Sequence, residues 1–355
     1  MASVEKNERG EWRVRWREGG RNRAKLIGPR KADAITFKGE IERAQRLGTV
    51  AHLEMGKLTL REFTEQQYWP SHAAKTSRKT QVLYAYLLDK HIIPHLGSLP
   101  LAQITPGATE AWLASLERDG TGRVAQQRAL ALLIGVLNRA VKWGELHNNA
   151  AALADKPKHR PEPIEPPTPA EVETIRARLK HGDATLTSVL AYAGLRPQEA
   201  LALRWTDIGD RVIRIGAEHK TGHRSVGLLA PLAADLKEWK LACGGRWELV
   251  FPNTRGERWS ESGWGNWRRR TWYGTEDNPG AAYGMGIHPY ALRHTYVSLL
   301  IRDGRNVIEV AKQAGHSPEV CLRTYAHAWA ELAGIGSAED AIREARVQQA
   351  ESQAG

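Results

Sequence analysis

Residues 157–167 form a proline-rich segment of alternating charge that divides this chain of 355 residues. Proline restricts the backbone and donates no amide hydrogen bond, so the segment predicts an extended, semi-rigid linker outside any packed core. The residues that follow, Thr168-Pro169-Ala170-Glu171, have the pattern of a helix start, with Thr168 as N-cap and Glu171 completing a capping box. The sequence therefore predicts one domain over 168–355 and further domains before the linker.

The first 55 residues predict a small three-stranded sheet covered by one helix. Trp12, Val14 and Trp16 alternate with arginines, and this period of two is typical of a strand with one packed and one charged face. Gly19-Gly20 can turn the chain into a second strand that ends near Ile27, and residues 3–6 supply a third. Apolar residues at helical spacing then predict a helix over 31–47 on the apolar face: Ala34, Phe37, Ile41 and Ala44.

The basic side chains of this sheet are candidate DNA ligands. They belong to the two longer strands: Arg13, Arg15, Arg17, Arg21, Arg23 and Lys25. A strand that gathers arginines on one face can contact the phosphates or base edges of a duplex. The alternative is a solvated sheet whose arginines only prevent edge-to-edge aggregation.

Residues 57–156 predict helices throughout, separated by turns that contain proline and glycine. The longest apolar-periodic stretch runs from Val124 to Trp143 and predicts one long helix of a bundle. The chain is therefore expected to be a multidomain, mostly α protein with small β elements, and its domains are expected to cover 1–55, 57–156 and 168–355.

The charge of the chain favours a polyanionic partner. A net charge of +11 and a pI near 9.7 suit a protein that gains affinity by releasing counterions from phosphates, although a ribosome-associated or membrane-surface protein can have the same balance. Cys243 and Cys321 have neither metal-ligand nor disulfide spacing, which favours a reducing interior. Because the sequence shows no apolar leader and no apolar run that could span a bilayer, a cytoplasmic location without membrane contact is expected.

Four stretches of the last domain carry the chemistry: residues 194–199, Lys220, residues 290–294, and residues 315–325. Arg196 and Arg293 can neutralise a phosphodiester, and Lys220 can protonate a leaving alkoxide. His316 can hold or move a proton, and Tyr325 can attack phosphorus. This chemistry requires neither a metal ion nor an organic cofactor.

Local patterns place these groups at the ends of helices and strands. Arg196 follows the helix-ending Gly194, and Lys220 lies at the turn between strands expected at 211–215 and 224–228. Arg293 is expected on a helix that begins at Pro289. Tyr325 is expected on a helix that begins at residues 317–318, directly after the glycine-ended helix that precedes His316.

These motifs, in the order Arg, Lys, Arg, His and Tyr, make the chain similar to the tyrosine recombinases, the phage-type integrases that cut and rejoin DNA through a phosphotyrosyl intermediate. The resemblance covers nearly the whole chain. It implies an N-terminal arm-binding domain, a helical core-binding domain and an α+β catalytic domain. It also implies that Arg196, Arg293 and His316 hold the scissile phosphate, that Glu199 orients the basic groups, that Lys220 protonates the 5′ oxygen, and that Tyr325 forms the 3′-phosphotyrosine.

The same resemblance implies the partners. It implies double-stranded attachment sites as substrate, a homotetramer on DNA, a location at the nucleoid, and the integration or excision of a mobile element such as a prophage. An excision factor and a host DNA-bending protein are further partners of such integrases, which the sequence does not identify. Related recombinases dock a C-terminal tail on a neighbouring protomer, and the helical pattern at 338–347 allows either this docking or a frayed surface helix.

One position departs from the family pattern. The family usually places a histidine three residues before the second arginine, and Tyr290 stands there in this chain. A tyrosine hydroxyl can donate a hydrogen bond to a phosphate, but its high pKa makes it a poor base at neutral pH. His288 is not expected to replace the histidine because residues five apart on a helix point apart, and His294 is expected to be structural.

Two other classes of protein remain as alternatives. A DNA-binding regulator could keep this fold without catalysis, although such a protein need not retain the whole set of catalytic groups. A type IB topoisomerase shares the chemistry but lacks the arm-like N-terminal sheet.

Overall fold

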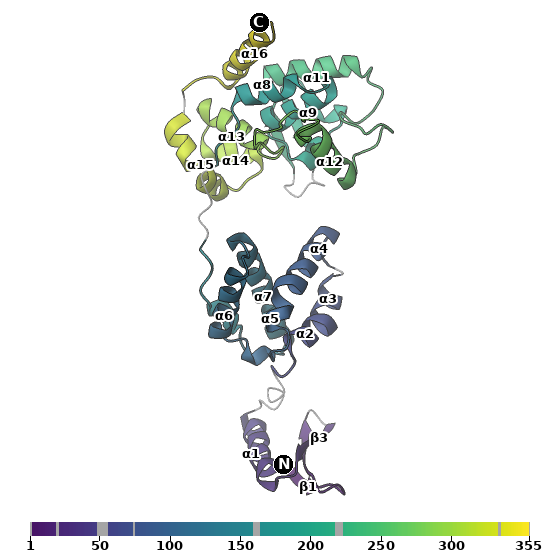
Figure 1. Cartoon of the computed structure of the whole chain (residues 1–355), viewed down its shortest axis with the longest axis vertical. Helices are drawn as coiled ribbons and strands as arrows, with labels where there is room; N and C mark the ends of the chain where they lie inside the picture. The colour runs from purple at the N-terminus through teal and green to yellow at the C-terminus, as the bar shows by residue number, and fades with distance from the viewer. Residues whose placement is uncertain are drawn as a thin grey trace. The chain divides into compact units, whose positions relative to one another are not determined.

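The computed structural model describes residues 2–18, 21–47, 56–73, 75–158, 164–216, 223–332 and 335–354. The chain forms two compact units, Met1–Pro161 and Glu162–Gly355, and the division between them falls in the proline-rich segment. Figure 1 shows a sheet and a helix at the N-terminal end, a group of helices after them, and a larger mixed unit at the C-terminal end. The three domain boundaries expected from the sequence stay a prediction.

The N-terminal sheet has the expected three strands, β1 (Ser3–Lys6), β2 (Trp12–Glu18) and β3 (Arg21–Gly28), which pair antiparallel in that order. Helix α1 (Lys31–Leu47) covers one face. Val14, Ala34 and Ile41 are fully buried between them, and the rings of Trp16 and Phe37 meet edge to face with centroids 6.0 Å apart. The predicted strand and helix periodicities are therefore confirmed here.

The described residues between 57 and 156 form helices joined by turns, as expected. In chain order these elements are α2 (Leu60–Phe63), η2 (Thr64–Tyr68), α3 (Trp69–Ala73), α4 (Arg78–Leu87), η3 (Leu88–Ile92), α5 (Ile93–Leu96), η4 (Leu101–Gln103), α6 (Pro106–Arg118), α7 (Arg123–Trp143) and η5 (Ala150–Leu153). The long α7 ends at Gly144 in the left-handed conformation, with φ of 82°. Its apolar face is buried against α4, α6 and the helical turns η2 and η3, which makes one core for this bundle.

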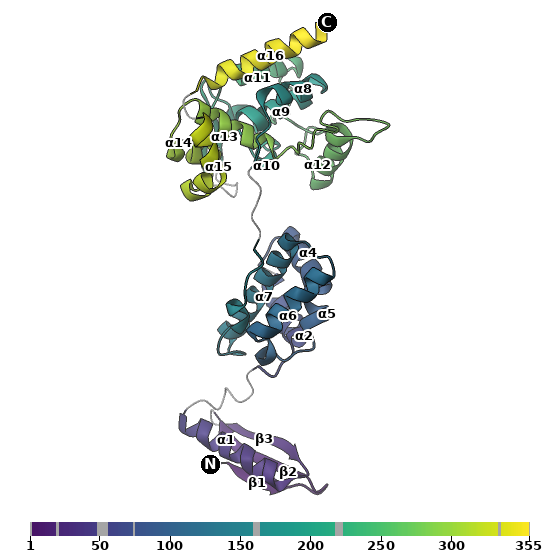
Figure 2. The same ribbon diagram turned by 60° about the vertical axis from the view of Figure 1, so that its left-hand side comes forward.

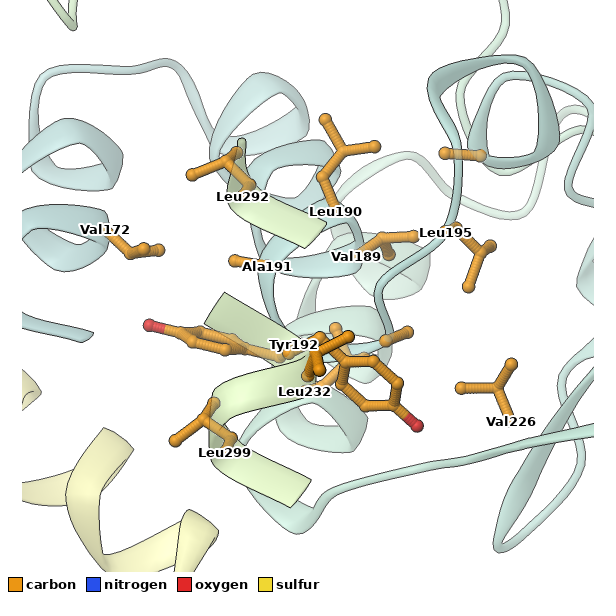
Figure 3. Close-up of a cluster of buried hydrophobic side chains, with 14 of the residues drawn as sticks. Val172, Val189, Leu190, Ala191, Tyr192, Leu195, Val226, Leu232, Leu292 and Leu299 are labelled. Atoms are coloured by element: carbon orange, nitrogen blue, oxygen red, sulfur yellow. The ribbon is translucent and has the colours of Figure 1, made fainter. Parts of the chain in front are cut away.

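The second unit consists of helices around a central helix, with one small hairpin. Its elements are α8 (Pro169–Ala177), α9 (His181–Tyr192), α10 (Pro197–Ala200), η6 (Trp205–Asp207), β4 (Val212–Ile215), β5 (Arg224–Gly227), α11 (Ala230–Ala242), α12 (Glu261–Trp267), η7 (Arg268–Tyr273), α13 (Leu292–Arg302), α14 (Val307–Ala314), α15 (Pro318–Leu332) and α16 (Ala338–Ala354). The capping box at Thr168 and Glu171 is present, as predicted. Helix α9 is buried from Thr185 to Tyr192, and α8, α11 and α13 pack against it. Figure 3 shows this core, with Leu190 of α9 near Leu292 of α13.

The C-terminal helix α16 docks on its own unit. It packs against α8 and α11, as Figure 2 shows, and Ile342 is fully buried. Arg346 donates to the buried carboxylates of Asp235, at 2.6 Å, and Glu173, at 3.3 Å. The alternative of a frayed surface helix is therefore wrong, because Ile342 is buried against the unit and Arg346 contacts two of its buried carboxylates.

Within the described ranges, every helix is too short or too polar to cross a bilayer.

Candidate active site

Arg196 lies where α9 ends and α10 begins. Gly194 ends α9 with φ of 59°, and a Cβ at this position would lie 2.3 Å from the ring of Tyr296, so glycine is required. The backbone N–H of Arg196 donates to Glu199 at 2.8 Å, and its guanidinium donates to Glu199 at 3.3 Å and to the carbonyl of Gly315 at 3.1 Å. About a quarter of the side chain, 26%, stays exposed, which leaves a cationic face open to a ligand.

The helix after Arg196 is shorter than the sequence indicated. The apolar run from 199 to 205 predicts a continuing helix face, but α10 ends at Ala200 and a 3-10 turn follows at Trp205. Trp205 donates its backbone N–H to the carbonyl of Glu248, and Val250 donates to the carbonyl of Leu203. These hydrogen bonds to a distant segment replace the next helical turns.

Arg293 is the second arginine, and it is almost completely buried, at 1% exposure. One terminal nitrogen donates to the carbonyl of Gly194, and Nη2 lies 3.1 Å from Nε2 of His316. Burial lowers the pKa of Arg293 to about 10, and the charge of Arg196 acts in the same direction. The guanidinium is still a cation at neutral pH, so two positive charges share this site.

Helix α13 begins at Leu292, three residues after the predicted start at Pro289. Residues 288–291 form a turn instead, in which Nδ1 of His288 accepts the backbone N–H of Ala291 at 2.9 Å. His288 therefore precedes the helix, and the helical spacing that was expected to exclude it does not apply. Its ring nitrogen is engaged in the turn.

His316 follows the glycine that ends α14. Gly315 has φ of 63°, as its predicted role as a cap requires, and its carbonyl is the one that receives Arg196. Nε2 of His316 must accept from Arg293, because arginine only donates, so a neutral ring carries its proton on Nδ1. Nδ1 is buried and has no hydrogen-bond partner among the described residues. Burial, followed by the charges of Arg293 and Arg196, lowers the pKa of His316 to about 4.

Tyr325 lies on α15 at a break in the helix, where its φ of −125° and ψ of 16° are not helical. The side chain is fully buried, and its ring stacks on His316 with centroids 6.5 Å apart. The hydroxyl oxygen lies 2.6 Å from Nδ1 of His294. Burial raises the pKa of Tyr325 above its ordinary value, so the hydroxyl is protonated at neutral pH.

Arg224 is a member of this cluster that the sequence motifs did not indicate. It is the first residue of β5, and its two terminal nitrogens donate to the carboxylate of Glu199 at 2.7 and 2.9 Å. Its Nε donates to the carbonyl of Gln313 at 3.1 Å. Burial acts to raise the pKa of Glu199, but the hydrogen bonds from Arg224 and from the Arg196 backbone outweigh it and lower the pKa to about 2. A signal was present, because Arg224 shares a strand face with the buried Val226.

Lys220 and Tyr290 are the other two candidate catalytic residues. Lys220 falls outside the described residues, so its place at a hairpin tip stays a prediction. Strands β4 and β5, which precede and follow the segment that contains it, pair antiparallel. Tyr290 is described and 43% exposed, and its ring lies edge-on to His294 with centroids 6.3 Å apart.

The N-terminal basic residues are divided between two faces of the sheet. Residues opposite one another in an antiparallel pair share a face, and Trp16 lies opposite Arg23 while Val14 lies opposite Lys25. Arg23 and Lys25 therefore share the face that α1 covers, and Lys25 lies 5.1 Å from the ring centre of Phe37. The open face carries the three arginines of β2: Arg13, Arg15 and Arg17.

Arg13 and Arg15 on this face have an acidic neighbour. Glu5 lies 3.5 Å from Arg13 and 3.2 Å from Arg15. The side chain of Arg21 is not described. DNA binding by all six basic residues stays a prediction, and the open face is where the arginines of β2 could meet a duplex.

The described cluster is cationic and joins groups from four separate segments. It offers two arginines for an anion, a neutral imidazole with a buried Nδ1–H, and a tyrosine hydroxyl beside a second imidazole. Across the described ranges, no group of three or more His, Cys, Asp and Glu side chains is placed to hold a metal ion. Such a set of groups suits phosphoryl transfer to the tyrosine oxygen.

Known proteins are similar to this chain in sequence. Residues 168–331 match the phage integrase family, and residues 59–116 match the phage integrase N-terminal SAM-like domain, so that together the matches span more than half of the chain. Tyrosine recombinase XerC of Rhodospirillum centenum is 26% identical over 74% of this chain and 81% of its own length. An integrase of Streptomyces ambofaciens is 28% identical over 65% of this chain and 66% of its own length.

Solved structures show the same fold. A lambda integrase tetramer bound to a Holliday junction superposes with a TM-score of 0.59 at 18% identity, over 90% of this chain and 94% of that chain. The Tn1549 transposon integrase in complex with transposon right end DNA gives the same TM-score at 17% identity, over 76% of this chain and 95% of that chain. The chain belongs to the phage integrase family of tyrosine recombinases.

Proposed function

We propose that this chain integrates or excises a mobile element by cutting and rejoining DNA at specific sites through a 3′-phosphotyrosyl intermediate. Its family acts by site-specific recombination. The proposal rests on the convergence of Arg196, Arg293, His316 and Tyr325, which come from three separate stretches of the chain and meet through hydrogen bonds and ring stacking.

The residues divide the reaction between them. Arg196 and Arg293 neutralise the non-bridging oxygens of the scissile phosphate, and the buried Nδ1–H of His316 donates to the same group. Tyr325 attacks phosphorus, the bond to the 5′ oxygen breaks, and Lys220 protonates that oxygen. Because the phosphotyrosyl bond keeps the energy of the phosphodiester, a 5′ hydroxyl of a partner strand reverses the step without ATP.

Tyr290 and Glu199 act beside these groups. The hydroxyl of Tyr290, at the exposed edge of the site, donates to a phosphate oxygen where the family usually has histidine. Glu199 fixes the orientation of Arg196 through the backbone and the guanidinium.

The proposed partner is double-stranded DNA at attachment sites. Lambda integrase is a tetramer on a Holliday junction in one similar structure, and a homotetramer of this chain on two duplexes follows that arrangement. The open face of the N-terminal sheet binds separate arm sites in this proposal, with an excision factor and a host DNA-bending protein as accessory partners. The protein works at the nucleoid, in the cytoplasm.

A covalent capture experiment tests the proposal. A pool of nicked random-sequence duplexes is incubated with the chain, and protein–DNA adducts are isolated under denaturing conditions and sequenced. The chain is expected to trap one family of related sequences, and EDTA is expected to leave the yield unchanged. Tyr325→Phe is expected to bind the recovered duplex normally and to form no adduct, while Tyr290→Phe still forms some.

Two results contradict the proposal in different ways. An adduct that persists in Tyr325→Phe rejects the choice of nucleophile. If the unaltered chain binds the DNA but traps none of it, the alternative of a regulator without catalysis is correct.

A further inference from the structure

The hydroxyl of Tyr325 has a specific neighbour that the family pattern did not indicate. Its oxygen lies 2.6 Å from Nδ1 of His294, a short hydrogen bond between α15 and the first turn of α13. The two rings are tilted, with centroids 5.7 Å apart. His294 directly follows Arg293, so the group beside the attacking oxygen and the group beside the phosphate lie on consecutive residues.

The other nearby groups are less suited to receive the proton of this hydroxyl. Nε2 of His316 accepts from Arg293, and its Nδ1 carries the proton of the neutral ring. Tyr290 occupies the usual histidine position, but a phenol is a weak base at neutral pH. Nδ1 of His294 is the imidazole nitrogen that the structure places on the hydroxyl.

We propose that His294 accepts the proton of Tyr325 as the tyrosine oxygen attacks the scissile phosphate. This inference rests on the proposed function and names a further catalytic residue within it. The O–H bond of Tyr325 breaks as its oxygen bonds to phosphorus, the proton moves to Nδ1, and the bond from phosphorus to the 5′ oxygen breaks. When a 5′ hydroxyl later attacks the phosphotyrosine, His294 returns the proton to the tyrosine oxygen.

The charges around His294 are consistent with this role. Burial lowers its pKa to about 4, and His288 and Arg293 lower it in the same direction, so at neutral pH the imidazole is uncharged and able to accept. Tyr290 from the preceding turn, and Tyr325 and His316 from the α15 side, also face it, and they carry no positive charge at neutral pH. A bound phosphate places a negative charge beside Arg293, which raises the basicity of His294 when the substrate is present.

The burial of Tyr325 sets a requirement on DNA binding. Its side chain has no exposed surface in the free chain, so the duplex must uncover the oxygen while His294 stays beside it. The hydrogen bond then keeps the oxygen oriented as the phosphate approaches.

The test compares two substitutions of His294 on the duplex that the unaltered chain traps covalently. His294→Asn places an amide oxygen near the position of Nδ1, so it keeps a hydrogen-bond acceptor but removes the base. His294→Ala removes both and leaves space for free imidazole. His327→Asn, on the same helix as the nucleophile, is the control. Dissociation constants and single-turnover rates of adduct formation are measured from acid to alkaline pH.

His294→Asn is expected to bind DNA as tightly as the unaltered chain and to form adduct ~100-fold more slowly or worse. The fall in rate on the acid side of the profile, which reports protonation of the base, should disappear in this variant. Adding imidazole should restore part of the rate of His294→Ala, in proportion to the concentration of imidazole base.

Two outcomes overturn the inference. A His294→Asn rate within about threefold of the unaltered rate, well short of the expected loss, shows that only the hydrogen bond matters. A slowed variant that keeps the acid side of the profile shows that another group takes the proton. If the unaltered chain traps no duplex, it is the proposed function that fails, before the variants are compared.

Discussion

Replacing Arg224 by methionine should destabilise the catalytic unit strongly. Arg224 and Glu199 are 6% and 3% exposed, and they form two hydrogen bonds of 2.7 and 2.9 Å. Removing one partner of a buried pair leaves an uncompensated charge and costs about 3–5 kcal/mol. Glu199 keeps its hydrogen bonds from Arg196, so we expect about 3 kcal/mol, at the lower end of that range.

The pKa of Glu199 gives a similar magnitude. A carboxyl pKa of about 2 in place of 4.5 corresponds to about 3 kcal/mol of stability. Because the folded-state value lies below the unfolded one, this stability is fully present above pH 4.5 and is lost as the pH falls toward 2. The difference between the unaltered chain and Arg224→Met should therefore shrink as the pH is lowered through this window.

The full chain is unfolded in urea, and pulsed hydrogen exchange of peptides from the catalytic unit monitors the unfolding of that unit alone. The experiment gives the difference in free energy of unfolding of the catalytic unit, without a contribution from the first unit. Arg204→Met is the matched control, because Arg204 pairs with Glu248 at exposures of 54% and 65%, and such a surface pair is worth at most about 1 kcal/mol. The double variant Arg224→Met with Glu199→Gln should recover part of the loss, since no buried charge remains unpaired. A loss from Arg224→Met no larger than that from Arg204→Met would refute the reasoning.

Two further predictions concern the leaving group and the N-terminal sheet. Lys220→Ala should cleave ordinary DNA poorly but recover on a substrate with sulfur in place of the bridging 5′ oxygen, because a thiolate needs little protonation to leave; equally slow cleavage of both substrates would assign Lys220 to DNA positioning. Removing residues 1–55 should abolish recombination between attachment sites and spare cleavage of a short core-site duplex. Each lost phosphate contact should reduce the slope of log affinity against log salt concentration for arm binding by about 0.9. A fragment of residues 1–55 that shows no preference for attachment-site DNA would count against arm recognition.

The sequence correctly predicted the features that depend on residues close together along the chain. The capping box at Thr168, the left-handed Gly315 and the strand at Trp12 each depend on residues within a few positions, and each is confirmed. The sequence predicted that α13 begins at Pro289, but the helix begins at Leu292. The ring nitrogen of His288 accepts a hydrogen bond that closes a turn before the helix, and no simple sequence pattern signals this use of histidine.

The contacts that build the site depend on tertiary packing, which local patterns do not report. Arg224 joins Glu199 across 25 residues, and Arg196 joins Gly315 across 119. His294 was expected to be structural, and only the packing of α13 on α15 brings it to Tyr325. The motifs therefore identified candidate groups, while their partners and their roles needed the fold.

The docking of α16 affects how the catalytic unit is made on the ribosome. Helix α16 is the last helix of the unit, yet it packs on α8, the first, where Arg346 joins Arg176 in pairing with Glu173 and Asp235. When α8 to α15 of a nascent chain have left the ribosome, Arg346 and the apolar face of α16 are still missing from their places beside Glu173 and Asp235. Contacts of such large sequence separation form slowly. The catalytic unit can therefore complete this packing only after α16 has left the ribosome.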